Sequence, residues 1–171
     1  RAMATAVRRN AVVFQTGSQQ RSERGFRVAC ELVRNGRIGK VHTVHVNVGG
    51  PPVDCYLPAQ PTPETLDWDM WLGPAPLRKF NPNHFHYNWH WFWNYGGGDL
   101  ANDGLHQIDI ARWTIDRTLP KAVSSTGAIH SMNDHRDTPN TQTVTCEFDG
   151  VTVALEQVLW TPYMRKTPLD L

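Results

Sequence analysis

The sequence lacks several features that would each indicate a particular class of protein. The 171-residue chain has no run of about 18 apolar residues, so no membrane-spanning helix and no membrane partner are expected. Its 17 basic and 16 acidic residues give a net charge of +1. That balance argues against nucleic-acid binding, which needs a basic face. The three cysteines, at positions 30, 55 and 146, indicate neither a disulfide framework nor a CxxC metal site.

Cysteine usage of this kind suits a reducing compartment. We therefore expect a cytoplasmic protein, with export left open because a leader peptide would precede residue 1. Neither GxGxxG nor GxxxxGK[ST] occurs, which predicts that this segment has no phosphate-binding loop of its own. No GxSxG is present either, so nothing supports nucleophilic catalysis by a serine.

Histidines are the one group that calls for a metal test. His84, His86 and His90, with His106 further on, have the residue type that binds zinc. An HxH in a loop rich in proline and asparagine is a weak signal, however, and surface or hydrogen-bonded histidines are the favoured interpretation. We predict no metal site, and a zinc-dependent hydrolase is the least favoured function.

The most informative stretch that is present begins with three glycines at 96–98. A helical pattern follows, with a start expected near Asp99, since a carboxylate suits a helix N-terminus. At about 100° per residue, one narrow stripe of this helix carries Asn102, His106, Asp109 and Trp113. Residues placed to face a core lie to one side of it: Ala101, Leu105, Ile108 and Ile115. The stripe is either a set of satisfied core or rim residues or the lining of a pocket for a polar small molecule.

The first 20 residues read as a helix (2–9), a strand (11–15) and a tight turn (16–18). This order resembles the last unit of a larger parallel α/β sheet. Because such a strand cannot bury both faces alone, we expect the rest of that sheet upstream. The predicted division is a remnant of a dinucleotide-binding domain at 1–20 and an incomplete C-terminal domain at 21–171, where 163–171 provide no closing element.

The second predicted domain is an α+β layer, a mostly antiparallel sheet with helices on one face. A helix capped by Ser22 leads to a strand at 41–48 that ends at 49–52. A long connection (51–88) contains a short helix at 64–72, and five of the seven tryptophans lie between 68 and 93, which argues for order. A strand is expected at 121–129, and a hairpin turns at Asp149-Gly150.

Four stretches, taken in order, resemble the glucose–fructose oxidoreductase / inositol dehydrogenase (Gfo/Idh/MocA) family. Residues 96–109 are similar to the signature GGG-x-L-x-D-x-G-x-H-x-x-D, and the other three are TGSQQRS (16–22), GRIGKV (36–41) and DWDMWLGPAP (67–76). The resemblance implies an NAD- or NADP-dependent oxidoreductase that acts on a sugar, cyclitol or related polyol. It also implies a homo-oligomer, and a cofactor loop on a Rossmann domain outside this chain.

The resemblance also implies roles for single residues. His106 matches the family's acid/base histidine, whereas Asn102 stands where the family has a carboxylate and cannot act as a base. Asp109, one turn on, either fixes the His106 tautomer or holds the helix in place. Gln19 is placed near the nicotinamide, and Arg21 near the substrate or in a salt bridge at the domain junction.

Two aromatic residues complete the predicted site. Trp93 and Tyr95 either form a wall of the sugar site or pack in the core. Two further functions stay open besides simple dehydrogenation. One is a transient redox cycle used for glycoside cleavage or epimerisation. The other is a non-catalytic protein that binds a ligand or a partner, in which Asn102 marks a lost activity.

Overall fold

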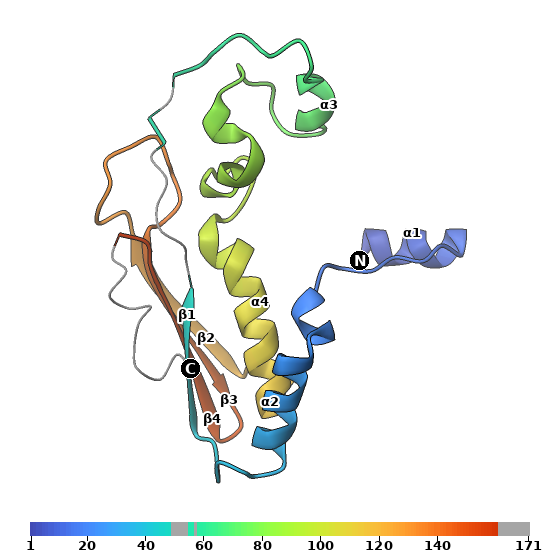
Figure 1. Ribbon diagram of the computed structural model, residues 1–171, viewed down its shortest axis with the longest axis vertical. Helices are drawn as coiled ribbons and strands as arrows, with labels where there is room; N and C mark the ends of the chain where they lie inside the picture. Colours follow the sequence, from blue (N-terminus) through green and yellow to red (C-terminus); the bar gives the residue numbers. More distant parts are fainter. Residues whose placement is uncertain (49–54, 57, 161–171) are drawn as a thin grey trace.

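A four-stranded sheet covered on one face by a long helix forms the centre of the molecule (Figure 1). The computed structural model describes residues 1–48, 55–56 and 58–160. The strands are β1 (Thr43–Val48), β2 (Ala122–Ala128), β3 (Thr141–Phe148) and β4 (Val151–Val158). They lie in the order β1-β4-β3-β2, with β1 parallel to β4 and the other pairs antiparallel. The predicted α+β layer with a mostly antiparallel sheet is confirmed.

The β3–β4 hairpin shows how sequence sets the register. Phe148 pairs with Val151 across the Asp149-Gly150 turn, and Gly150 has a φ of 71°, which favours glycine. Alternate residues of β3 and β4 point to the covered face, as their period of two requires. They form one core with β1 and the long helix: Val46, Val48, Ala111, Ile115, Val144, Cys146, Phe148, Val153 and Leu155.

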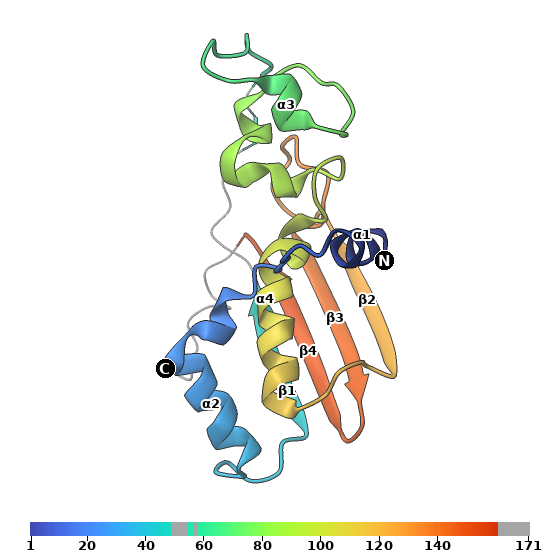
Figure 2. The same ribbon diagram turned by 90° about the vertical axis from the view of Figure 1, so that its right-hand side faces the viewer.

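Four α-helices and three short 3-10 helices complete the described chain. The α-helices are α1 (Ala2–Asn10), α2 (Arg24–Arg34), α3 (Trp68–Leu72) and α4 (Gly98–Ile115). The 3-10 helices are η1 (Gln19–Ser22), η2 (Pro82–His84) and η3 (His86–Trp91). Helix α4 covers the sheet and α2 lies alongside α4 (Figure 2). None of these helices is both long enough and apolar enough to cross a membrane.

Two local predictions at the start of the chain are wrong. Residues 12–18 form neither helix nor strand, although a strand was expected at 11–15. Val13 is 100% exposed, and no described strand offers the neighbour that an isolated strand needs for its hydrogen bonds. Ser22 does not cap α2, because it lies within η1 and the N-cap position is Glu23.

Helix α2 packs against α4 mainly through Cys30. Cys30 is buried, and its sulfur lies 3.2 Å from the hydroxyl of Thr114 on α4. Phe26 and Val33 are half-buried on the same side, whereas Ala29 is exposed. The predicted end, at 49–52, of the strand expected at 41–48 lies outside the described residues. The end of the chain at 163–171 lies outside them too.

Residues 64–95, which we call the aromatic segment, fold together at the N-terminal end of α4 (Figure 1). Trp68 and Trp71 stack with ring centroids 4.7 Å apart, and the indole N–H of Trp68 donates to the Arg78 carbonyl. The side chain of Asp67 caps α3 by accepting from the amide of Met70. These contacts confirm the order that the tryptophans predicted.

Candidate functional site

The glycines at 96–98 fix where α4 begins. A Cβ added to Gly96 would lie 2.8 Å from the Cα of His90, and Gly98 adopts a φ of 78° with its Cβ position 3.1 Å from Thr138. Side chains at these positions would push η3 and the loop at 131–140 away from the helix. The three glycines therefore hold the first turn of α4 between these two segments.

Helix α4 begins near Asp99, as expected. The N-cap position is Gly97, and Asp99 lies buried in the first turn. Its carboxylate is 3.4 Å from Nε2 of His90, which is equally buried, while Nδ1 of His90 donates to the Tyr87 carbonyl. The close approach of these two buried side chains places η3 against the start of the helix.

The predicted stripe of α4 exists and is neither sealed nor fully exposed. Asn102, His106, Asp109 and Trp113 are all half-buried. Ile108 packs against the core and Ile115 is buried, as predicted, but Leu105 is 59% exposed and Ala101 is exposed too. The covered face of α4 is therefore narrower at its N-terminal half than the pattern suggested.

Arg21 and Asp109 form the ion pair that anchors the stripe. Arg21 donates from Nε and Nη2 to the two carboxylate oxygens at 2.6 and 2.8 Å. Its guanidinium also lies 5.4 Å from the ring centroid of Trp113. The hydrogen bonds from Arg21 hold the pKa of Asp109 below its usual range despite partial burial. Asp109 thus joins η1 to α4, and η1 also carries Gln19, whose side chain is exposed.

A second polar cluster surrounds Asn102. Its Nδ2 donates to Oδ1 of Asp103 at 3.1 Å, and the Tyr87 hydroxyl donates to Oδ2 of Asp103 at 3.1 Å. Sequence reasoning missed Tyr87 and Asp103, because the helical angle of about 100° per residue separates the Cβ directions of neighbours. The spacing of Asp99 and Asp103, one turn apart, is the signal that would have indicated the cluster.

The two aromatic candidates have different surroundings. Trp93 is exposed, and its backbone amide donates to Asp137 at 2.7 Å. Tyr95 is half-buried within the aromatic segment, with its ring centroid 5.7 Å from that of Trp71 and 5.3 Å from that of His84. Burial raises the pKa of Tyr95. The contacts described for these two residues thus lie within the aromatic segment and the loop at 131–140.

The three histidines between residues 84 and 90 have different surroundings. His84 meets the ring of Phe92 edge-on at 4.5 Å, and burial lowers its pKa. His86 is exposed and His90 pairs with Asp99. Among the described residues no group of three or more His, Cys, Asp and Glu side chains is placed to hold a metal ion.

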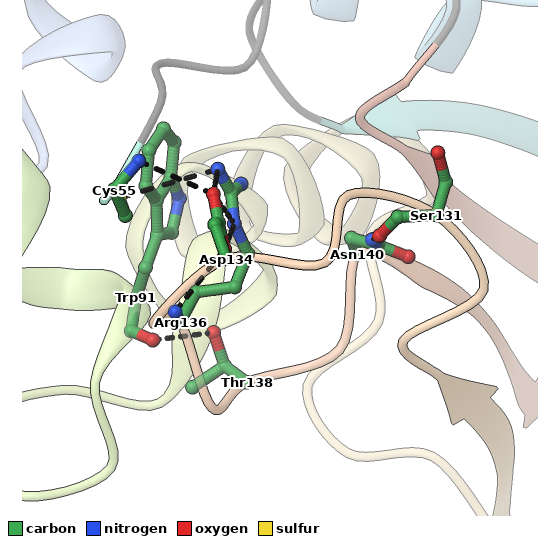
Figure 3. A network of polar contacts seen from close by, with 7 residues as sticks. All are labelled: Cys55, Trp91, Ser131, Asp134, Arg136, Thr138 and Asn140. Carbon is green, nitrogen blue, oxygen red and sulfur yellow. Dashed lines mark hydrogen bonds and ion pairs between the residues drawn. The ribbon is translucent and has the colours of Figure 1, made fainter.

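The loop at 131–140 holds a buried ion pair and contacts Trp91 of the aromatic segment (Figure 3). Arg136 binds both carboxylate oxygens of Asp134, and its guanidinium lies 4.4 Å from the ring centroid of Trp91. The hydroxyl of Thr138 donates to the Trp91 carbonyl at 3.1 Å. The loop that contacts Gly98 is thereby held in place.

Comparisons with known proteins agree with this architecture. Residues 52–157 match the family model described as "Oxidoreductase family, C-terminal alpha/beta domain" of the Gfo/Idh/MocA group. The chain belongs to the Gfo/Idh/MocA oxidoreductase family. The resemblance seen in the four sequence stretches is confirmed, and no curated protein sequence matches significantly.

Several solved structures share the fold of this Gfo/Idh/MocA chain. GenD2 from gentamicin A biosynthesis, in complex with NAD, has a TM-score of 0.64 at 22% identity over 95% of this chain and 38% of its own. The WlbA dehydrogenase from Bordetella pertussis, in complex with NADH and UDP-GlcNAcA, has 0.62 at 16% over 93% and 39%. WlbA from Chromobacterium violaceum, with the same ligands, has 0.62 at 18% over 93% and 37%. The chain thus spans about two-fifths of the length of these proteins.

Proposed function

We propose that the protein that carries this chain transfers a hydride between NAD or NADP and a sugar, cyclitol or related polyol. The observation that supports this most is the placement of His106 and Asn102. They lie one turn apart on the half-buried stripe of α4, in a domain of an oxidoreductase family. The ion pair between Arg21 and Asp109 fixes the next turn of the same stripe.

The chemistry assigned to these residues is the oxidation of a secondary alcohol. The bound nicotinamide supplies the hydride acceptor for the substrate C–H. His106 accepts the hydroxyl proton as the carbonyl forms, since imidazole exchanges protons near neutral pH. Asn102 orients the substrate hydroxyls by hydrogen bonding, and in the reverse direction His106 returns the proton to the carbonyl oxygen.

The residues of this chain fit only one end of the cofactor. Gln19 offers an exposed side-chain amide on η1, beside the Arg21 that reaches α4, and an amide suits the carboxamide of nicotinamide. The sequence contains no glycine-rich loop for the pyrophosphate. We therefore propose that residues 1–20 belong to a dinucleotide-binding domain and 21–171 to the substrate domain, with the phosphates bound outside this chain.

The test compares the full-length protein with its His106→Ala variant. NADH or NADPH formation is followed by absorbance with a panel of myo-inositol, glucose and UDP-GlcNAcA, the last because the WlbA structures contain it. Turnover should fall by about 10²–10⁴-fold in the variant, while cofactor affinity, measured by fluorescence titration, should stay nearly unchanged. Equal turnover in both proteins would remove His106 from the chemistry.

The same panel of compounds separates the two alternative functions from simple dehydrogenation. Product formation without net NADH release supports a transient redox cycle for epimerisation or glycoside cleavage. Binding of a panel compound without turnover supports a non-catalytic protein. We also propose that the protein is a homo-oligomer, which light scattering on the full-length protein tests directly.

A further inference from the structure

The side chain of Asn102 has two chemically different ends, and the structure determines which one is engaged. Nδ2 donates to Oδ1 of Asp103 at 3.1 Å. An amide nitrogen only donates and an amide oxygen only accepts. With Nδ2 directed at the carboxylate, Oδ1 is the atom turned to the other side.

Tyr87 hydrogen-bonds the carboxylate of Asp103, which in turn accepts from the side-chain amide of Asn102. Its hydroxyl donates to Oδ2 of Asp103 at 3.1 Å, so each carboxylate oxygen has its own donor. Burial and the charge of Asp103 raise the pKa of Tyr87 to about 12. The phenol therefore keeps its proton, and remains a donor, at every pH at which the enzyme would be assayed.

The groups around Asp103 come from α4 and η3. Asp99 lies one turn earlier on α4, while His90 and Tyr87 face it from η3. Burial, and then the charge of Asp99, raise the pKa of Asp103, and the hydrogen bond from Tyr87 opposes this. A carboxyl group offers an acceptor oxygen to Asn102 in either protonation state, so the contact does not depend on the charge.

We propose that Tyr87 and Asp103 are positioning residues that fix Asn102 so that its Oδ1 accepts a hydrogen bond from a substrate hydroxyl next to the one that reacts at His106. The proposal rests on the proposed function, in which His106 and Asn102 contact the substrate. Asn102 is then a fixed acceptor for the neighbouring hydroxyl, which leaves the single proton of the reacting hydroxyl to His106. The carboxylate that the family carries at this helix position is replaced by an oriented amide, with the carboxylate moved one residue along.

Three variants of the full-length protein test this with the panel compound that is turned over fastest. Asp103→Ala removes the acceptor and lets the amide rotate, so kcat should fall about 10- to 100-fold with KM changed by less than about threefold. Asp103→Asn keeps an acceptor oxygen, and its kcat should stay within about threefold of wild type. Tyr87→Phe removes only the hydroxyl and should lower kcat about three- to tenfold.

The Asp103→Asn variant separates positioning from proton transfer. If Asp103 only positions the amide, the pH profile of kcat keeps its shape in this variant. A kcat as low as that of Asp103→Ala, or a lost limb of the profile, would show that the carboxylate itself handles the proton and would overturn the proposal. Asp116→Asn, at the far end of α4 and paired with Arg34, is the control and should match wild type.

The outcomes also separate this proposal from the function on which it rests. If Asp103→Ala does not fold, as judged by thermal unfolding, Tyr87→Phe carries the test because it removes a single oxygen atom. Wild-type kcat in Tyr87→Phe and Asp103→Ala, with His106→Ala inactive, would overturn the positioning role alone. Wild-type turnover in His106→Ala would overturn the positioning role together with the proposed function.

Discussion

Replacing Arg136 by methionine should destabilise the protein strongly, because the ion pair with Asp134 is buried. Both side chains are 1% exposed. Arg136 donates to the carboxylate from Nε at 2.8 Å and Nη2 at 2.6 Å, and the Cys55 amide donates to it at 3.2 Å. Removing one partner of such a pair leaves a buried charge uncompensated, which costs about 3–5 kcal/mol.

The pH dependence of this loss has a definite sign. Burial raises the pKa of Asp134, but the hydrogen bonds from Arg136 outweigh it and the net shift is downward. In the wild type the pair therefore contributes stability above the unfolded pKa of about 3.9 and loses it as pH falls through the lower folded pKa. In Arg136→Met burial dominates, so Asp134 can relieve its cost by taking up a proton. The difference from wild type should shrink as pH falls.

Urea unfolding followed by tryptophan fluorescence measures this difference, since Trp91 lies against the guanidinium. Unfolding is compared at about pH 7 and about pH 4.5, both above the unfolded pKa of about 3.9, so that a carboxyl raised by burial takes up its proton in the folded variant alone. Lys121→Met is the matched control, because it breaks the pair with Asp149 whose side chains are 66% and 72% exposed. It should leave the midpoint unchanged. An Arg136→Met midpoint equal to wild type, or a gap that does not narrow at the lower pH, would refute the reasoning.

Two further predictions concern the placement of α4. Gly96→Ala should destabilise by about 1–3 kcal/mol in urea unfolding, because its Cβ would lie 2.8 Å from backbone; Gly25→Ala, with nothing within 4 Å of the new Cβ, should stabilise by about 0.5–1 kcal/mol. A loss of stability in both variants, or in neither, would contradict this reasoning. Asp109→Asn should cost about 1 kcal/mol or less, since Arg21 is 44% exposed, and should speed amide hydrogen exchange in η1; unchanged exchange would show that the ion pair does not hold η1 to α4.

Local chemistry explains what the sequence predicted well. The β3–β4 hairpin follows from alternation on both sides of Asp149-Gly150, and each feature involves residues close in sequence. The start of α4 follows from its glycines, because the backbone there comes too close to neighbouring atoms for a side chain to fit. The stripe with Asn102 and His106 follows from helical periodicity alone.

The misses depend on distant partners or on side-chain reach. Residues 11–15 have strand composition, but a strand needs neighbours that the described chain does not offer. An aspartate near a helix start is typical of a cap, but the carboxylate of Asp99 lies 3.4 Å from Nε2 of His90 in η3 instead. The burial of Arg136 could not be predicted, because it lies in a loop of polar residues and nothing nearby in the sequence shows that Trp91 covers it. Each of these depends on tertiary packing that periodicity does not encode.

The most direct test of the proposed chemistry is a crystal structure of the full-length protein with NAD(H) and the compound it turns over. The reacting hydroxyl should lie within about 2.6–3.2 Å of a ring nitrogen of His106, and Oδ1 of Asn102 should face a neighbouring hydroxyl of the same compound. A structure in which the compound binds away from the α4 stripe, with His106 touching protein atoms only, would contradict the assignment.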